Sequence, residues 1–121
     1  MMHVDFAETL EERLETIQEF MFQQDPVSAP DRIEQLWSEI YCFGDLVALH
    51  PKIGRPAGAL AAISIEGQVR LARVLRLAVE AGLPELREYV LRSHLMLYAH
   101  SNTNVLLLSI RHQRELGYAP G

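Results

Sequence analysis

LREYVLRSHLMLYAHSNTNVLLLSIRHQRELGY, the stretch from Leu86 to Tyr118, decides the fold that this sequence predicts. It holds three apolar runs, at residues 86–91, 95–99 and 105–110, with short polar breaks between them. Apolar runs of this length that stop at serine, asparagine and threonine are typical of strands in an antiparallel meander. After residue 110 the chain turns polar, in the sequence RHQRELGY. We therefore expect a buried last strand that carries a charged cluster to an edge of the sheet.

The front of the chain predicts a short strand followed by a helical hairpin. His3–Phe6 is short, but as a strand it would let the N-terminus join the sheet. Thr9 and Glu12 have the spacing of a capping box, which predicts a helix start, and Asp25-Pro26 predicts the end of that helix. A second helix is expected after Ser28, which precedes an early proline and an acid. The expected buried positions are Leu10, Leu14, Ile17, Phe20 and Met21 in the first helix, and Ile33, Leu36, Trp37, Ile40, Tyr41 and Val47 in the second.

A turn-rich connector at residues 50–56 leads into a third predicted helix. The spacing predicts this helix over Gln68–Ala81, with Gly82 as its C-terminal stop. The expected apolar side consists of Val69, Ala72, Leu75 and Val79. Arg70, Arg73 and Arg76 recur every three residues and so line one slowly drifting face. That face is either a solvated surface or a docking surface for an acidic partner.

Together these patterns predict one α+β domain over residues 1–121, with an antiparallel sheet packed on the hairpin and an extra helix before the meander. The single cysteine, Cys42, fits a reducing cytoplasm and is expected to be buried in the second helix. The sequence shows no secretory signal pattern and no apolar run of membrane-spanning length. We expect a soluble, cytoplasmic protein without membrane association.

Charge divides the chain into two unlike parts. The net charge is -5, yet nearly all of the acidic excess lies in the first fifty residues and the remainder is basic. A basic face of this kind suits an acidic partner or a nucleic acid. No cofactor motif is present, because the chain lacks both a glycine-rich phosphate loop and a G-x-S-x-G elbow. His94, His100 and His112 lie on neighbouring predicted strands, but they lack a zinc-ligand spacing, so neither metal nor cofactor is expected.

Several motifs resemble a known bacterial family. They are Leu86-Arg87-Glu88 at the start of the first meander strand, Tyr98 within LMLYAH, and LLLSIRHQRELGY at the end. With the strand, the two helices and the connector that precede them, they resemble the RelE/ParE superfamily of toxins from type II toxin–antitoxin systems, often labelled plasmid stabilisation proteins. The resemblance covers most of the chain. Residues 57–82 depart from it as a helical insertion.

The resemblance implies two alternative activities. RelE-like toxins are ribosome-dependent mRNA endonucleases (mRNA interferases), and the residues that match catalytic positions in type are Arg87, Arg111, His112 and Tyr118. Glu88 and Leu95 depart from that pattern, since Glu88 stands where a second base would help and Leu95 where those nucleases carry an arginine. ParE-like toxins instead bind DNA gyrase and trap it on cleaved DNA, which requires no catalytic set. This second branch is favoured, because a carboxylate and an acidic hairpin both disfavour phosphate chemistry.

The resemblance also implies partners. A cognate antitoxin would bind across the sheet and hairpin, with its acidic residues on Arg87, Arg92, Arg111 and Arg114, whereas Arg32 is expected to matter little. The third possibility is an orphan interaction domain without toxicity. In that case residues 57–82 would contact another protein or a second copy of the chain in a homodimer.

Overall fold

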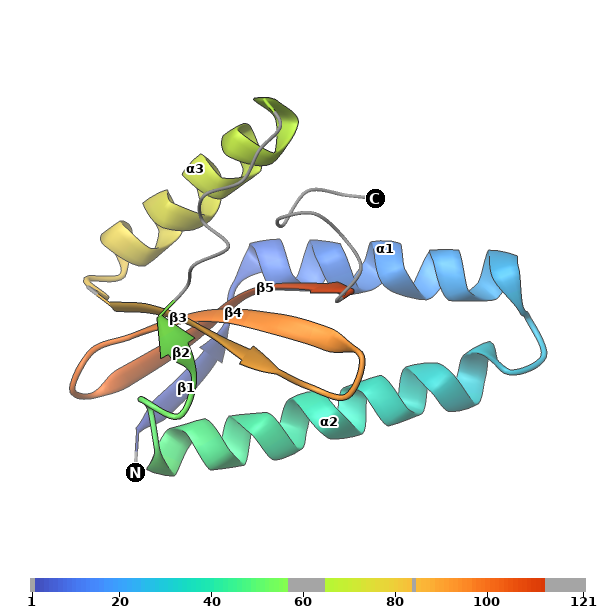
Figure 1. Cartoon of the computed structure of the whole chain (residues 1–121), viewed down its shortest axis with the longest axis horizontal. Helices are drawn as coiled ribbons and strands as arrows, with labels where there is room; N and C mark the ends of the chain where they lie inside the picture. Colours follow the sequence, from blue (N-terminus) through green and yellow to red (C-terminus); the bar gives the residue numbers. More distant parts are fainter. Residues whose placement is uncertain (1, 57–64, 84, 113–121) are drawn as a thin grey trace.

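The computed structural model describes residues 2–56, 65–83 and 85–112 and is an α+β structure built on one mixed sheet (Figure 1). The strands follow the order β1-β5-β4-β3-β2 across the sheet. The predicted α+β fold class is confirmed, and the N-terminal strand joins the sheet as expected, but it does so in parallel, so the sheet is mixed rather than antiparallel throughout. In chain order the elements are β1 (His3–Phe6), α1 (Glu8–Gln24), α2 (Ala29–Leu49), β2 (Arg55–Pro56), α3 (Ile65–Glu80), β3 (Glu85–Val90), β4 (His94–His100) and β5 (Asn104–His112).

The three C-terminal strands form the expected antiparallel meander, and β1 pairs in parallel with the free side of β5. Beyond β1 that side of β5 is covered by α1, because the Thr9 hydroxyl donates to the Leu108 carbonyl at 2.5 Å and Arg13 Nε donates to the Ile110 carbonyl at 3.2 Å. At the other edge, the two residues of β2 pair with β3. The sequence did not predict β2, since two residues are too short to carry an alternating pattern.

Both faces of the central strand β4 are buried, and every residue from His94 to His100 is buried. Met96 and Tyr98 belong to the main core beneath α1 and α2, while Leu97 and Ala99 belong to a second core that includes residues of α3. Accordingly, α2 and α3 lie on opposite sides of the sheet (Figure 1). Burial on two faces explains why β4 reads as one continuous apolar run.

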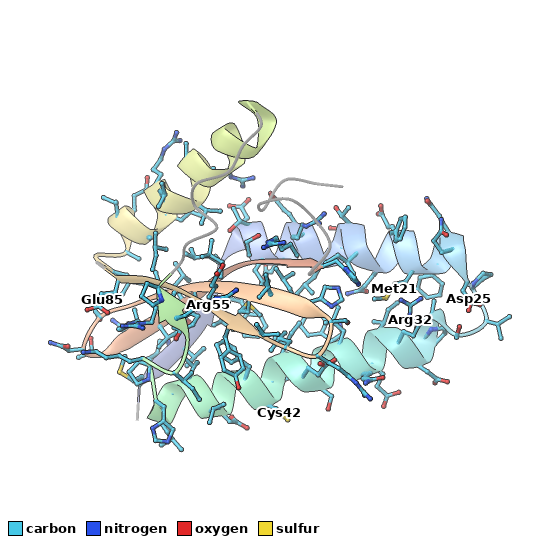
Figure 2. The ribbon with its side chains drawn as sticks, viewed as in Figure 1. Met21, Asp25, Arg32, Cys42, Arg55 and Glu85 are labelled. Atoms are coloured by element: carbon cyan, nitrogen blue, oxygen red, sulfur yellow. The ribbon has the colours of Figure 1, made fainter. Side chains whose placement is uncertain are left out.

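Three local predictions about the hairpin were wrong. The capping box does not form, because α1 begins at Glu8 after Ala7 and the Thr9 hydroxyl bonds to Leu108 of β5 instead. Cys42 is exposed rather than buried, on the outer side of α2 (Figure 2). Tyr41 and Phe20 were expected to be buried, but each side chain is 61% exposed. Tyr41 instead stacks on Trp37, with ring centroids 5.8 Å apart, and lies tilted against Phe6.

The third helix is real, but its buried face differs from the predicted one. Val74 and Ala78 pack into the second core, whereas Ala72 is exposed and Val79 is 76% exposed. Gly82 ends this segment with a φ of 71°, a left-handed conformation that glycine adopts without strain. None of the helices within the described residues has the length and apolar character needed to cross a membrane.

Candidate functional site

The helical hairpin extends beyond the end of the sheet, and a cavity of about 670 Å³ lies between them. Its walls come from α1, α2, the turn between β3 and β4, and the end of β5. Figure 2 shows Met21 of α1 and Arg32 of α2 in the space between the two helices. The lining residues are Arg13, Thr16, Ile17, Phe20, Met21, Arg32, Gln35, Leu36, Glu39, Arg92, Ser93, His94 and His112.

Three arginines reach this cavity from three different elements. Arg13 comes from α1 and is only 7% exposed, because its Nε donates to the Ile110 carbonyl of β5. Arg32 comes from the first turns of α2, and Arg92 comes from the turn between β3 and β4. That turn is fixed to α2, since the Arg92 backbone N–H donates to Glu39 Oε1 at 2.8 Å. Among the described residues, the cavity therefore brings Arg13, Arg32 and Arg92 together with the carboxylate of Glu39.

Two histidines face each other at the sheet end of the cavity. His94 opens β4 and His112 closes β5, where they are direct partners in the ladder, with ring centroids 5.3 Å apart. A bulge creates this pairing: Leu97 lies opposite Ser109 but Tyr98 lies opposite Leu107, so β5 has one extra residue. Without that residue Arg111, not His112, would lie opposite His94.

The cationic surroundings change the chemistry of His94. Its side chain is 6% exposed, and burial, together with the positive charges of His112, Arg13 and Arg32, lowers the pKa of His94 to about 4. His94 is thus a neutral imidazole at pH 7, with Nδ1 at 3.2 Å from the Ser93 hydroxyl. The positive potential that disfavours a proton on His94 favours an anion in the same place.

Arg87 lies near the opposite end of the sheet from His112. Its Nη1 donates to the Gly54 carbonyl at 2.7 Å, and its Nε lies 3.2 Å from Nε2 of His100. Tyr98 completes this arrangement, because its hydroxyl donates to the Pro51 carbonyl and accepts from the Gly54 N–H. Arg87 and Tyr98 therefore hold the connector against the sheet.

The other predicted site residues also lie apart. Arg111 pairs with Leu95 on the face of the sheet that α3 covers, and it is 8% exposed. His112, the next residue, points to the hairpin face and lines the cavity. Arg92 lies at the β3–β4 turn and is exposed. Arg114 and Tyr118 fall outside the described residues. Of the predicted arginines within them, Arg92 lines the cavity with His112, while Nη1 of Arg111 donates to the His112 carbonyl at 3.4 Å.

Sequence reasoning missed the hairpin side of this cavity. Arg13 carried a signal, because it lies three residues after Leu10 and four before Ile17, within the apolar stripe of α1. A charged residue in such a stripe is buried with partners and is a candidate for function. Arg32 carried no such signal, and the bulge that aligns His94 with His112 has no glycine to mark it.

Among the described residues, no group of three or more histidine, cysteine, aspartate or glutamate side chains could hold a metal ion. Comparison with models of protein families and with curated protein sequences found no match for this chain.

Proposed function

We propose that this protein is a ParE-like toxin of a type II toxin–antitoxin system, which acts by binding DNA gyrase and is neutralised by a cognate antitoxin. The order of its elements supports the proposal. A strand, a helical hairpin, a connector and a three-strand meander follow one another as the sequence resemblance implies, and α3 lies within the one segment that departs from it. Arg92 is the exposed arginine of the predicted antitoxin-binding set within the described residues.

The observation that carries the choice of branch is the separation of the nuclease candidates. Arg87 is held by the connector, Arg111 lies on the opposite face of the sheet from His112, and these three do not surround one point. Cleavage of a phosphodiester needs a base, a cation and an acid around a single phosphate. A toxin that acts by binding needs no such convergence.

A RelE-like endoribonuclease is the second candidate, and one specific observation favours it. His112 lines a cavity with His94 and three arginines, and that set contains groups able to transfer protons and to stabilise a phosphate. This site would use a different set of residues from the one that the resemblance implies. It would also leave Arg87 and Arg111 outside the chemistry.

Controlled expression of the protein alone separates these functions. We expect growth arrest with altered plasmid supercoiling and intact bulk mRNA, and an His112→Ala variant that retains most of this toxicity. Cleaved transcripts on translating ribosomes that disappear in the His112→Ala strain would instead establish the nuclease. Normal growth with the folded protein present would contradict both toxins and favour an orphan interaction domain.

A further inference from the structure

Charged and apolar side chains both line the cavity, and Arg32 of α2 lies with Met21 in the space between the two helices (Figure 2). Arg13, Arg92 and the histidine pair lie at the sheet end, where the main chain of β5 and the β3–β4 turn approach the helices. The facing surfaces of α1 and α2 supply apolar side chains. These are Ile17, Phe20, Met21 and Leu36. A ligand that contacts both kinds of side chain carries a negative charge and an apolar body.

Cavity size limits the ligand to a small molecule. A volume of about 670 Å³ lies within the range of pockets that bury most of a drug-sized ligand. Guanidinium groups bind carboxylates and phosphates with two parallel hydrogen bonds, so three arginines around one cavity are suited to either head group. Within the described residues, Glu39 is the carboxylate that lines the cavity, and it accepts the backbone N–H of Arg92.

We propose that the cavity between the hairpin and the end of the sheet binds a small amphipathic anion, in which a carboxylate or phosphate head is attached to an apolar body. The head lies among Arg13, Arg32 and Arg92, and the body lies against Phe20 and Met21. The pKa of His94, lowered mainly by burial and further by the positive charges of His112, Arg13 and Arg32, agrees with a positive potential in the cavity. This binding does not depend on the toxin function proposed above.

Titration calorimetry on the full chain tests the proposal with four probes: octanoate, octyl phosphate, 1-octanol and inorganic phosphate. We expect octanoate, octyl phosphate or both to bind, and a comparison of the two identifies the preferred head group. We expect 1-octanol and inorganic phosphate to bind at least about tenfold more weakly, because each lacks one half of the recognition. Equal binding of 1-octanol, equal binding of inorganic phosphate, or no binding of either charged octyl probe would overturn the proposal.

Two variants locate the binding within the molecule. Arg32→Gln removes one exposed cation without disturbing the core, and it should weaken binding of the charged probe about tenfold while leaving the unfolding transition unchanged. Arg76→Gln, at an exposed position on α3, is the matched control and should bind as the wild type does. If the two variants bind alike, the anion does not occupy this cavity and the proposal fails.

Discussion

Tyr98 and Gly54 show how one contact fixes the connector. Tyr98 is fully buried, and burial raises the pKa of its hydroxyl, which keeps the proton that it donates to the Pro51 carbonyl at 2.7 Å. The Gly54 N–H donates back to the same oxygen at 2.9 Å. This close approach requires a glycine, because a Cβ at position 54 would lie 2.7 Å from the Glu88 carbonyl oxygen and 2.8 Å from the Tyr98 ring.

Gly54→Ala should therefore destabilise the protein by about 1–3 kcal/mol, the usual effect of overpacking a closed site. Gly44→Ala is the matched control, since a Cβ at that helical position meets nothing within 4 Å. It should stabilise the protein by about 0.5–1 kcal/mol, because alanine has the higher helix propensity. Urea unfolding of both variants measures the difference, and an equal effect of the two substitutions would contradict the described packing.

His94 makes stability depend on pH. Its pKa is about 4 in the folded protein, below the ordinary histidine value of 6.5, so the unfolded chain binds a proton first as the pH falls. The contribution of neutral His94 is complete above pH 6.5, decreases between pH 6.5 and 4, and amounts to at most about 3 kcal/mol.

The variant His94→Gln removes this titration but keeps a polar side chain next to Ser93. Urea unfolding between pH 7 and pH 4 should show a smaller loss of stability in the variant than in the wild type. Carboxylates titrate in both proteins and cancel in the comparison. The same loss in both would show that His94 is not held neutral by its burial and the surrounding cations.

At the scale of elements, α3 is part of the folded domain. Val74 and Ala78 pack against Leu97, Ala99 and Leu108 of the sheet. Arg73 also forms an ion pair with Glu12 of α1, at 2.7 Å, which raises the pKa of Arg73. This exposed pair contributes little to stability, so the apolar contact determines whether α3 stays in place. Within the described residues, Arg73 pairs with acidic side chains of α1 in the same chain.

Two substitutions on α3 distinguish its buried face from the one that the sequence predicted. Val74→Asp should destabilise the protein by about 3 kcal/mol or more, because it buries an unpaired carboxylate at a position that is 4% exposed. Val79→Asp, at a position that is 76% exposed, should change stability by less than about 0.5 kcal/mol. Thermal unfolding with light scattering checks both. Comparable losses of stability in the two variants would contradict the observed buried face of α3 and favour the face that the sequence predicted.

The sequence predicts elements well where an apolar pattern is long, and poorly where a contact depends on tertiary structure. The meander and the hairpin follow from continuous apolar runs and from Asp25-Pro26. Thr9 looked like a helix cap, but the carbonyl of Leu108 provides a competing partner that no local pattern reveals. Likewise, the site residues Arg13, Arg92 and His94 come together only in the folded structure, which depends on a bulge and a turn. Their spacing along the chain therefore could not show that they share one site.

In the whole molecule, some acidic side chains from the first half of the chain contact basic residues from the second half. Glu8 and Glu12 of α1 approach Arg73 of α3, while Glu39 of α2 accepts the Arg92 N–H. Charge asymmetry along the chain therefore does not by itself give two separate charged faces. Independently of that asymmetry, the fold brings Arg13 and Arg32 from the acidic half together with Arg92 from the basic half in one cavity, which is the candidate site for an anion.

Gyrase binding tests the proposed function most directly. Purified protein mixed with DNA gyrase and supercoiled plasmid should produce linear DNA after denaturation and protease treatment, because a ParE-like toxin traps the enzyme on cleaved DNA. The His112→Ala variant should do so to a similar extent, since binding energy is spread over several interface residues. No linear DNA at an excess of folded protein, and no complex with gyrase, would contradict the proposed function.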